Sequence, residues 1–316
     1  MKFLEDIVAA RPTIEAAIQK WGYAAEHNFF WFQCYVDPGW RNIFIESEHG
    51  ALFTSYNPKK QVYAVVFDPL AAPEQRIPLL LEYTDWIFKH TQAKKIWFQL
   101  ETPVQQRLWQ ELPVEYHANK VYFSLVWPIY DMRDFDTALP GGHFKSIRKE
   151  MHRFYRDHAV TVRDAHAYPD AAALHAVVDH WRERRPNPEK ALDGAYHQVI
   201  DNNFKGMDEA RIFEVDGKPV GFNAGWNVPN SDRFYGAIGL HDYSIDGLGT
   251  MLYLEDLFYL KGHGYGEVDM AGSEKPLLWF KNKFCLPKRT YRTSHFSITR
   301  AQKPLALHLS EALQSN

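Results

Sequence analysis

Residues 214–284 read EVDGKPVGFNAGWNVPNSDRFYGAIGLHDYSIDGLGTMLYLEDLFYLKGHGYGEVDMAGSEKPLLWFKNKF, and this stretch decides the fold. The apolar runs on either side of Asp216-Gly217 predict a β-hairpin, because this dipeptide favours a tight turn. A strand, a helix that stops at two glycines, a strand and a helix are predicted to follow over 233–240, 248–261, 266–270 and 275–283. This order predicts a mixed α/β domain.

The first half of the chain predicts the same order of elements. Its residues 1–19 indicate an amphipathic helix, because charged residues interrupt the apolar pattern that a signal peptide needs. Short apolar runs between turn residues predict strands over 29–36, 42–46, 51–56 and 62–67. Helical or alternating patterns then predict a helix, a strand, a helix and a strand over 73–90, 95–100, 104–111 and 115–127.

The aperiodic segment 131–142, with its Pro140-Gly141-Gly142, marks the expected domain boundary. We therefore expect one domain over 1–136 and a second over 137–316. The elements expected in the second domain, besides those of residues 211–283, are helices over 143–156, 169–185, 193–205 and 303–313 and strands over 160–163 and 291–298. The repeated order predicts two similar modules, each a mixed, mostly antiparallel sheet flanked by helices.

Composition narrows the classes of function. The 316 residues are 46% hydrophobic and 24% charged, which is typical of a globular protein. The net charge of −3 gives no global basic field, so a nucleic acid or an anionic lipid would need a local patch. The two cysteines are far apart and fit a reducing, cytoplasmic setting. The longest apolar runs have about ten residues, half of what a membrane-spanning helix needs. Peripheral contact with a membrane surface is left open.

Several common catalytic motifs are missing from the sequence. It contains no HExxH, no GxSxG and no GxxxxGK, the usual signatures of zincins, α/β-hydrolases and P-loop proteins. The fifteen histidines are scattered without paired spacing, so no metal site is expected.

Three segments carry a family resemblance. Residues 214–284 resemble the second half of an acyl-CoA N-acyltransferase (GNAT)-like domain in the order of hairpin, glycine-containing helix start, GYGEVDM strand and WFKNKF helix. Residues 144–164, FKSIRKEMHRFYRDHAVTVRD, are similar to the opening of the catalytic half of FemAB-type aminoacyltransferases. Residues 65–100, VVFDPLAAPEQRIPLLLEYTDWIFKHTQAKKIWFQL, resemble the phosphatidylglycerol lysyltransferase C-terminal family of tandem acetyltransferase-like domains.

The resemblance implies transfer of an acyl or aminoacyl group from aminoacyl-tRNA or acyl-CoA to an amine or hydroxyl. It implies a catalytic second half and a degenerate first half, with no tightly bound cofactor. The acceptor would be a small molecule, a lipid head group or a peptide, and tRNA would be a partner if it is the donor. The competing class is a GNAT-fold protein without catalysis, which binds a small molecule or acts as a scaffold.

The predicted helix start at Asp246-Gly247-Leu248-Gly249-Thr250 is the candidate donor site. A helix start exposes unpaired N–H groups that bind phosphate, and glycine lets a ligand approach the backbone. The basic or amide residue that acetyl-CoA enzymes carry here is missing, and Asp246 would repel a pyrophosphate. The missing motif mildly favours an aminoacyl-tRNA donor, while the net charge of −3 weighs mildly against it. Alternatively, Asp246 caps the helix and the glycines only shape the turn.

A basic helix offers a second donor contact. Spacings of three and four residues place Lys145, Arg148 or Lys149, His152 and Arg156 on one stripe. This stripe suits a phosphate-rich donor such as a tRNA acceptor stem, CoA or a phospholipid head. A merely solvated basic face is an equal alternative.

The candidate catalytic residues are Asp269, Glu274 and Lys281. The resemblance implies that an acidic residue such as Asp269 binds the amine of the aminoacyl group, with Glu274 a second candidate. It also implies that Lys281 faces the active site, where an ammonium would stabilise an oxyanion or contact phosphate. The structural alternatives are an Asp269–Lys281 ion pair or a loop-stabilising hydrogen bond for Asp269, and a solvated lysine.

Overall fold

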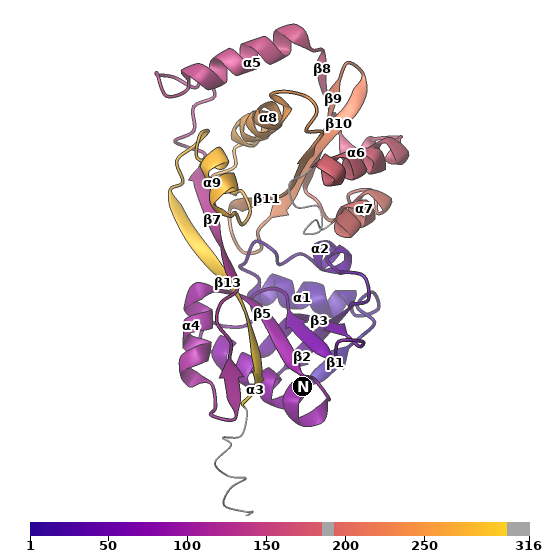
Figure 1. The fold of residues 1–316 in the computed structure, drawn as a ribbon, viewed down its shortest axis with the longest axis vertical. Helices are drawn as coiled ribbons and strands as arrows, with labels where there is room; N and C mark the ends of the chain where they lie inside the picture. Colours follow the sequence, from indigo (N-terminus) through magenta and orange to yellow (C-terminus); the bar gives the residue numbers. More distant parts are fainter. Residues whose placement is uncertain (185–192, 302–316) are drawn as a thin grey trace, which may run out of the picture.

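The structure, a computed structural model, describes residues 1–184 and 193–301 (Figure 1). Its first half contains β1 (Lys2–Leu4), α1 (Arg11–Trp21), α2 (Phe29–Cys34), β2 (Arg41–Ser47), β3 (Gly50–Asn57), β4 (Val62–Val65), α3 (Arg76–His90), β5 (Lys95–Glu101), α4 (Thr102–Glu111), β6 (Tyr116–Ala118) and β7 (Phe123–Asp131). Its second half contains α5 (Lys145–Asp157), β8 (Val160–Asp164), a 3-10 turn (Ala165–Ala167), α6 (Ala171–Arg184), α7 (Asp193–Asp201), β9 (Glu209–Val215), β10 (Lys218–Asn227), β11 (Arg233–His241), α8 (Leu248–Gly262), β12 (Glu267–Asp269), α9 (Lys275–Lys281) and β13 (Arg289–Arg300). The helix predicted over 303–313 lies outside the described residues.

The strands of the described chain form one continuous sheet in the order β1-β2-β3-β4-β5-β13-β7-β12-β11-β10-β9-β8, with β6 beside β13. Only β4–β5 and β11–β12 pair in parallel, so each half repeats an antiparallel run that ends in a parallel pair. The last strand, β13, lies between β5 and β7, and β7 in turn pairs with β12. The two halves are therefore joined at the centre of the sheet. The division at residues 136 and 137 stays a prediction.

Three apolar cores cover the sheet. One packs α3 and α4 against the first half, and another packs α5 and α8 against the second. The third core spans both halves, because α1, α2, α6 and α7 share it with residues of β7, β10 and β11 (Figure 1). Within residues 1–184 and 193–301, no helix combines the length and apolar character needed to cross a bilayer.

The predicted strand over 29–36 is wrong, because Phe29–Cys34 forms helix α2. Asn28 caps this helix by accepting a hydrogen bond from the Trp31 N–H at 3.0 Å, and it also donates to Gly206 O at 2.9 Å. The run Phe-Phe-Trp-Phe is mostly buried, and a short apolar run of this kind has no period that separates helix from strand. The Asn28 cap, which is held by its long-range bond to Gly206, therefore selects the helix over the strand.

Two further boundaries differ from the sequence prediction. The N-terminal helix starts only at Arg11, with Pro12 in its first turn, while residues 2–4 form β1 and pair with β2. The single strand predicted over 115–127 is two strands, β6 and β7, both of which pair with β13. The other predicted elements within the described residues lie within a few residues of their expected places.

Candidate functional site

Asp269 marks the site where the two halves meet. It ends β12 and pairs with Tyr235 of β11 on one side and Ile129 of β7 on the other. Because cross-strand partners share a face and neighbours along a strand alternate, Val268 points into the α5–α8 core while Asp269 points to the α1–α2 side. We call this side, formed by β5, β13, β7, β12 and β11, the junction face.

The Asp269 carboxylate is fully buried, with 0% exposure. The Tyr291 hydroxyl donates to it at 2.8 Å and the Ala271 N–H donates at 3.2 Å. Burial raises the pKa of Asp269 to about 6, although the nearby Arg233 charge and these two hydrogen bonds oppose the rise. The carboxylate thus takes up a proton close to neutral pH. The bond from Ala271 is the loop-stabilising bond that the sequence left open as an alternative role.

Lys281 contacts the loop over 270–273, which follows β12, and its side chain is buried, with 6% exposure. Its ammonium donates to Met270 O, to Ala271 O at 3.2 Å and to Ser273 Oγ at 2.9 Å. Burial lowers the pKa of Lys281 to about 7, against the opposing charge of Asp269. Among the described residues it forms no direct ion pair with Asp269, and it is not a solvated helix lysine. It holds the backbone that follows β12.

Aromatic rings surround Asp269 on the junction face. Trp127 stacks on Tyr291 with ring centres 5.4 Å apart, and Tyr235 lies 5.9 Å from Trp127. The Trp127 indole N–H donates to Thr293 Oγ1 at 2.9 Å, which fixes its ring. These rings exclude water and strengthen electrostatic contacts with any group that reaches the carboxylate.

The first half of the chain supplies further charged groups that the sequence analysis missed. Together with Asp269 and Arg233 of the second half, the first-half residues Glu26, Asp68 and Glu101 form what we call the junction cluster. Glu26 accepts from Gln99 Nε2 at 2.7 Å, and burial followed by the charges of Asp68 and Asp269 raises its pKa. Asp68 is buried and accepts from the Glu101 N–H at 3.1 Å.

Arg233 is the cation of this cluster and is only 9% exposed. It donates to Tyr23 O at 3.0 Å, while its Nε has no hydrogen-bond partner within the described residues. A sequence signal exists for one member of the cluster. Glu101 ends β5 as Asp269 ends β12, and both strands are the second members of the parallel pairs. Comparing the two repeats would have pointed to Glu101.

His27 fixes the segment that carries Glu26. Its Nδ1 accepts from the N–H groups of Tyr23 and Ala24 at 3.2 and 3.3 Å, so Nε2 carries the proton and donates to Asp68 O at 2.9 Å. Burial lowers the pKa of His27 to about 4. The folded protein therefore holds a neutral imidazole at pH values where the unfolded chain is already protonated.

We expect the free energy of unfolding of His27→Gln to depend less on pH than that of the wild type between pH 6.5 and 4. Since the pKa of His27 is depressed in the folded state, its stabilising effect is present above pH 6.5 and is lost as the pH falls from 6.5 to 4. Over this range the wild type should lose roughly 3 kcal/mol more than the variant. Urea unfolding between pH 7 and 4 measures this difference. Parallel curves for the two proteins would contradict the assignment.

The predicted donor loop has a different local structure. Helix α8 begins at Leu248, and Gly247 with φ +81° is its cap, without a side-chain capping bond. Asp246 is exposed and forms a 2.7 Å ion pair with Arg153 of α5, so its interpretation as the helix cap is wrong. At Gly249, a Cβ atom would lie 2.7 Å from His241 Nε2, so the space beside this glycine holds the chain's own histidine. Thr250 follows in the first turn and is partly buried.

The basic stripe lies on α5, which packs beside α8 (Figure 1) on the side of the sheet opposite to the junction face. Arg148 donates to Leu139 O and to Gly141 O, so it holds the preceding loop. Lys145 and Lys149 are exposed, and their ammonium groups have no ion pair or hydrogen bond among the described residues. The stripe and the Asp246 loop therefore lie together, because Arg153 of the same helix pairs with Asp246. Asp269 and Lys281 lie together at a different place, where both contact Ala271. Glu274 is exposed at the start of α9 and makes no capping bond.

Comparisons with known proteins agree with this architecture. The family described as "Phosphatidylglycerol lysyltransferase, C-terminal" matches residues 39–314. The comparison with curated proteins gives no match.

Among solved structures, L-PGS from Bacillus licheniformis is similar over 94% of this chain and 94% of its own, with a TM-score of 0.64 and 16% identity. FemX is similar over 94% and 97%, with a TM-score of 0.60 and 12% identity. A tandem GNAT protein from the clavulanic acid biosynthesis pathway is similar over 96% and 99%, with a TM-score of 0.54 and 14% identity. These likenesses confirm the predicted tandem GNAT-like fold, and the family match covers most of the chain. The chain therefore belongs to the phosphatidylglycerol lysyltransferase C-terminal family.

Proposed function

We propose that the protein transfers an acyl or aminoacyl group from an activated donor to an amine or hydroxyl acceptor. The family membership supports this class of reaction, and both aminoacyl-tRNA and acyl-CoA stay as donor classes. The acceptor heteroatom attacks the donor carbonyl, the bond to the donor's oxygen or sulfur breaks, and the acceptor's proton passes to that leaving group. Both donors are cytoplasmic compounds, and we propose the same compartment for the protein. Lipid head groups, peptides and small molecules are the acceptor classes.

The observation that carries the proposal is the buried Asp269 between aromatic rings. A carboxylate with a pKa of about 6 is mostly ionised at pH 7, and it binds an ammonium or accepts a proton from an attacking amine. Asp269 is fully buried, so a ligand reaches it only when a neighbouring group moves; the Tyr291 hydroxyl and the loop over 270–273 contact it directly. Lys281 acts as a positioning residue in this proposal, because it holds that loop through two carbonyls and Ser273.

A transfer assay tests the proposal. The purified protein is incubated with lysyl-tRNA, alanyl-tRNA or acetyl-CoA together with phosphatidylglycerol vesicles, a peptide amine or a small amine, and products are identified by mass spectrometry. We expect an acylated acceptor with at least one donor. A donor that binds and is never consumed would favour the alternative of a GNAT-fold protein that only binds small molecules.

The basic stripe gives a separate prediction for the donor. Lys145→Ala with Lys149→Ala should weaken donor binding, and the slope of log affinity against log salt should fall by roughly 1.5–2, because about two phosphate contacts are lost. The control is Lys59→Ala with Lys60→Ala, which removes the same charge from an exposed turn of the first half. Titration of tRNA and CoA esters at several salt concentrations measures both quantities. If donor affinity fell equally in the two double variants, the stripe would be only a solvated surface.

A further inference from the structure

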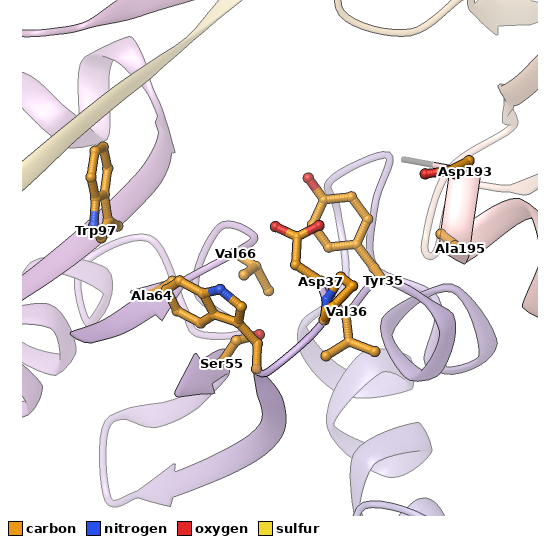
Figure 2. A pocket seen from close by; sticks show the side chains of 12 residues that line it. Tyr35, Val36, Asp37, Ser55, Ala64, Val66, Trp97, Asp193 and Ala195 are labelled. Atoms are coloured by element: carbon orange, nitrogen blue, oxygen red, sulfur yellow. The ribbon is translucent and has the colours of Figure 1, made fainter. Parts of the chain in front are cut away.

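A pocket of about 620 Å³ opens between the first half and the start of α7. The loop after α2 contributes Tyr35, Asp37 and Trp40, strand β5 contributes Trp97, and α7 contributes Asp193. Figure 2 shows the Tyr35 ring and the Asp37 carboxylate projecting from one loop, with Trp97 across from them and Asp193 on the far side. Its size is in the range of small-molecule sites.

A buried hydrogen-bond network holds the wall of this pocket. The Asn42 side chain is buried and donates to Phe32 O and to Tyr35 O at 3.4 Å, which fixes the end of α2. Its Oδ1 accepts from the Ser55 hydroxyl at 2.6 Å, and Ser55 itself lines the pocket. The loop that carries Tyr35 and Asp37 is therefore attached to β2 and β3. The wall is preorganised for binding.

The charges that line the pocket have one sign. Among the described residues that line it there are two carboxylates and no lysine or arginine. Asp193 is already paired with Arg182 at 3.0 Å. Asp37 is exposed, and its carboxylate has no ion pair or hydrogen bond within the part of the chain that the structure describes. An anionic ligand would be repelled here, whereas a cation would find an unpaired carboxylate.

The aromatic rings complete the recognition chemistry. Burial, and then the negative charges of Glu26 and Asp37, raise the pKa of Tyr35, so its ring stays neutral and electron-rich. The pocket's Trp40 is partly exposed and makes no ring or cation contact within residues 1–184 and 193–301. The Lys95 ammonium already lies 5.1 Å from the centre of the Trp97 ring, and Tyr35 packs against Trp31 and Phe67 with ring centres 5.5 and 5.6 Å apart. Trp40 is therefore the main ring for a ligand, and Tyr35 is a fixed ring beside it. Tryptophan and tyrosine faces attract ammonium groups.

We propose that this pocket binds an organic cation, an ammonium group on an apolar body, with its charge at Asp37 and its alkyl part against Trp40 and Tyr35. Primary and quaternary ammonium groups share this chemistry. Nothing in the proposal depends on group transfer at Asp269. Binding is measured without a donor, so failure of the transfer assay and failure of this proposal are separate results.

The test uses the full chain with choline, n-butylammonium and 3,3-dimethyl-1-butanol, the neutral isostere of choline. Indole N–H signals in NMR titrations report binding at the pocket tryptophans. We expect at least one ammonium probe to bind with a dissociation constant of about 1 mM or below, and the neutral isostere to bind roughly tenfold more weakly. The two ammonium arms distinguish a quaternary from a primary ligand.

Two variants locate the binding. Asp37→Asn and Trp40→Leu should each weaken the ammonium probe about five- to tenfold, because one removes the charge and the other removes the ring. The controls are Asp232→Asn and Trp279→Leu, exposed residues outside the pocket, and both should bind as the wild type does. Thermal unfolding confirms that every variant is folded. No binding by either ammonium, equal affinity for the neutral isostere, or unchanged affinity in Asp37→Asn would overturn the proposal.

Discussion

Asp269→Asn should slow group transfer ten- to a hundredfold while the fold is kept. The substitution preserves the shape of the side chain and one acceptor oxygen for the Tyr291 hydroxyl, but it removes the charge that would meet an amine and places an NH2 group where the other oxygen accepts from the Ala271 N–H. Losing one charged contact costs about 1.5–3 kcal/mol, which gives this range of rates. Single-turnover rates with saturating donor, corrected for the folded fraction, measure the effect. Full specific activity in a destabilised variant would show that Asp269 is only structural.

The pH dependence separates a chemical role of Asp269 from a loss of shape. Because the pKa of Asp269 is about 6, the wild-type rate should fall as the pH drops below 6 and the carboxylate becomes protonated. The rate of Asp269→Asn should show no such fall at acid pH. Tyr291→Phe removes a hydrogen bond that stabilises the ionised form of Asp269. The fall in rate should therefore begin at a higher pH in this variant. A fall at acid pH that is identical in all three proteins would belong to another group.

Lys281→Met should change the alkaline side of the stability curve by several kcal/mol. The pKa of Lys281 falls from 10.5 in the unfolded chain to about 7 in the folded one, so the unfolded state binds more protons between these values. Wild-type stability should therefore rise with pH from 7 to 10.5, by about 4–5 kcal/mol from this group alone. The variant has no such group, and its stability should stay flatter over this range. Denaturant unfolding at several pH values measures the difference.

Lys275→Met is the matched control for this experiment, because it removes an exposed lysine from the same helix. It should keep the wild-type rise in stability. If Lys275→Met and Lys281→Met gave the same pH profile, the buried ammonium would not be the source. Lys281→Met should also slow transfer without abolishing donor binding, since the loop over 270–273 loses the group that holds it.

The fold could be predicted largely from the sequence because its signals are local. The Asp216-Gly217 turn, the glycines after α8 and the alternation in the strands lie within single elements, and the structure has each of them nearly in place. Helix α2 could not be predicted, because its mostly buried apolar run has no period and its Asn28 bonds to Gly206, 178 residues away. The insertion of β13 between β5 and β7 is equally non-local.

The candidate site was only half visible in the sequence. Asp269 and Lys281 lie close together in the chain, at the end of a predicted strand and on the helix predicted after it, and the family resemblance implied that both face the active site. Glu26 and Asp68 reach the same place from the other half, through contacts that no local pattern encodes. The donor loop remains a prediction, but its surroundings could not be seen in the sequence. The glycine pattern suggested space for a ligand, but His241 of the neighbouring strand lies beside Gly249.

The central claim is that the transferred group lies on the junction face, and photo-labelling tests it most directly. A CoA thioether and an aminoacyl-adenosine analogue, each with a diazirine in place of the acyl side chain, are bound, irradiated and mapped by peptide mass spectrometry. The account predicts labels within residues 23–35, 233–237, 269–273 and 289–293, which adjoin Asp269, and weaker labelling in Asp269→Asn. Labels confined to α5, or equal labelling of wild type and Asp269→Asn, would contradict it.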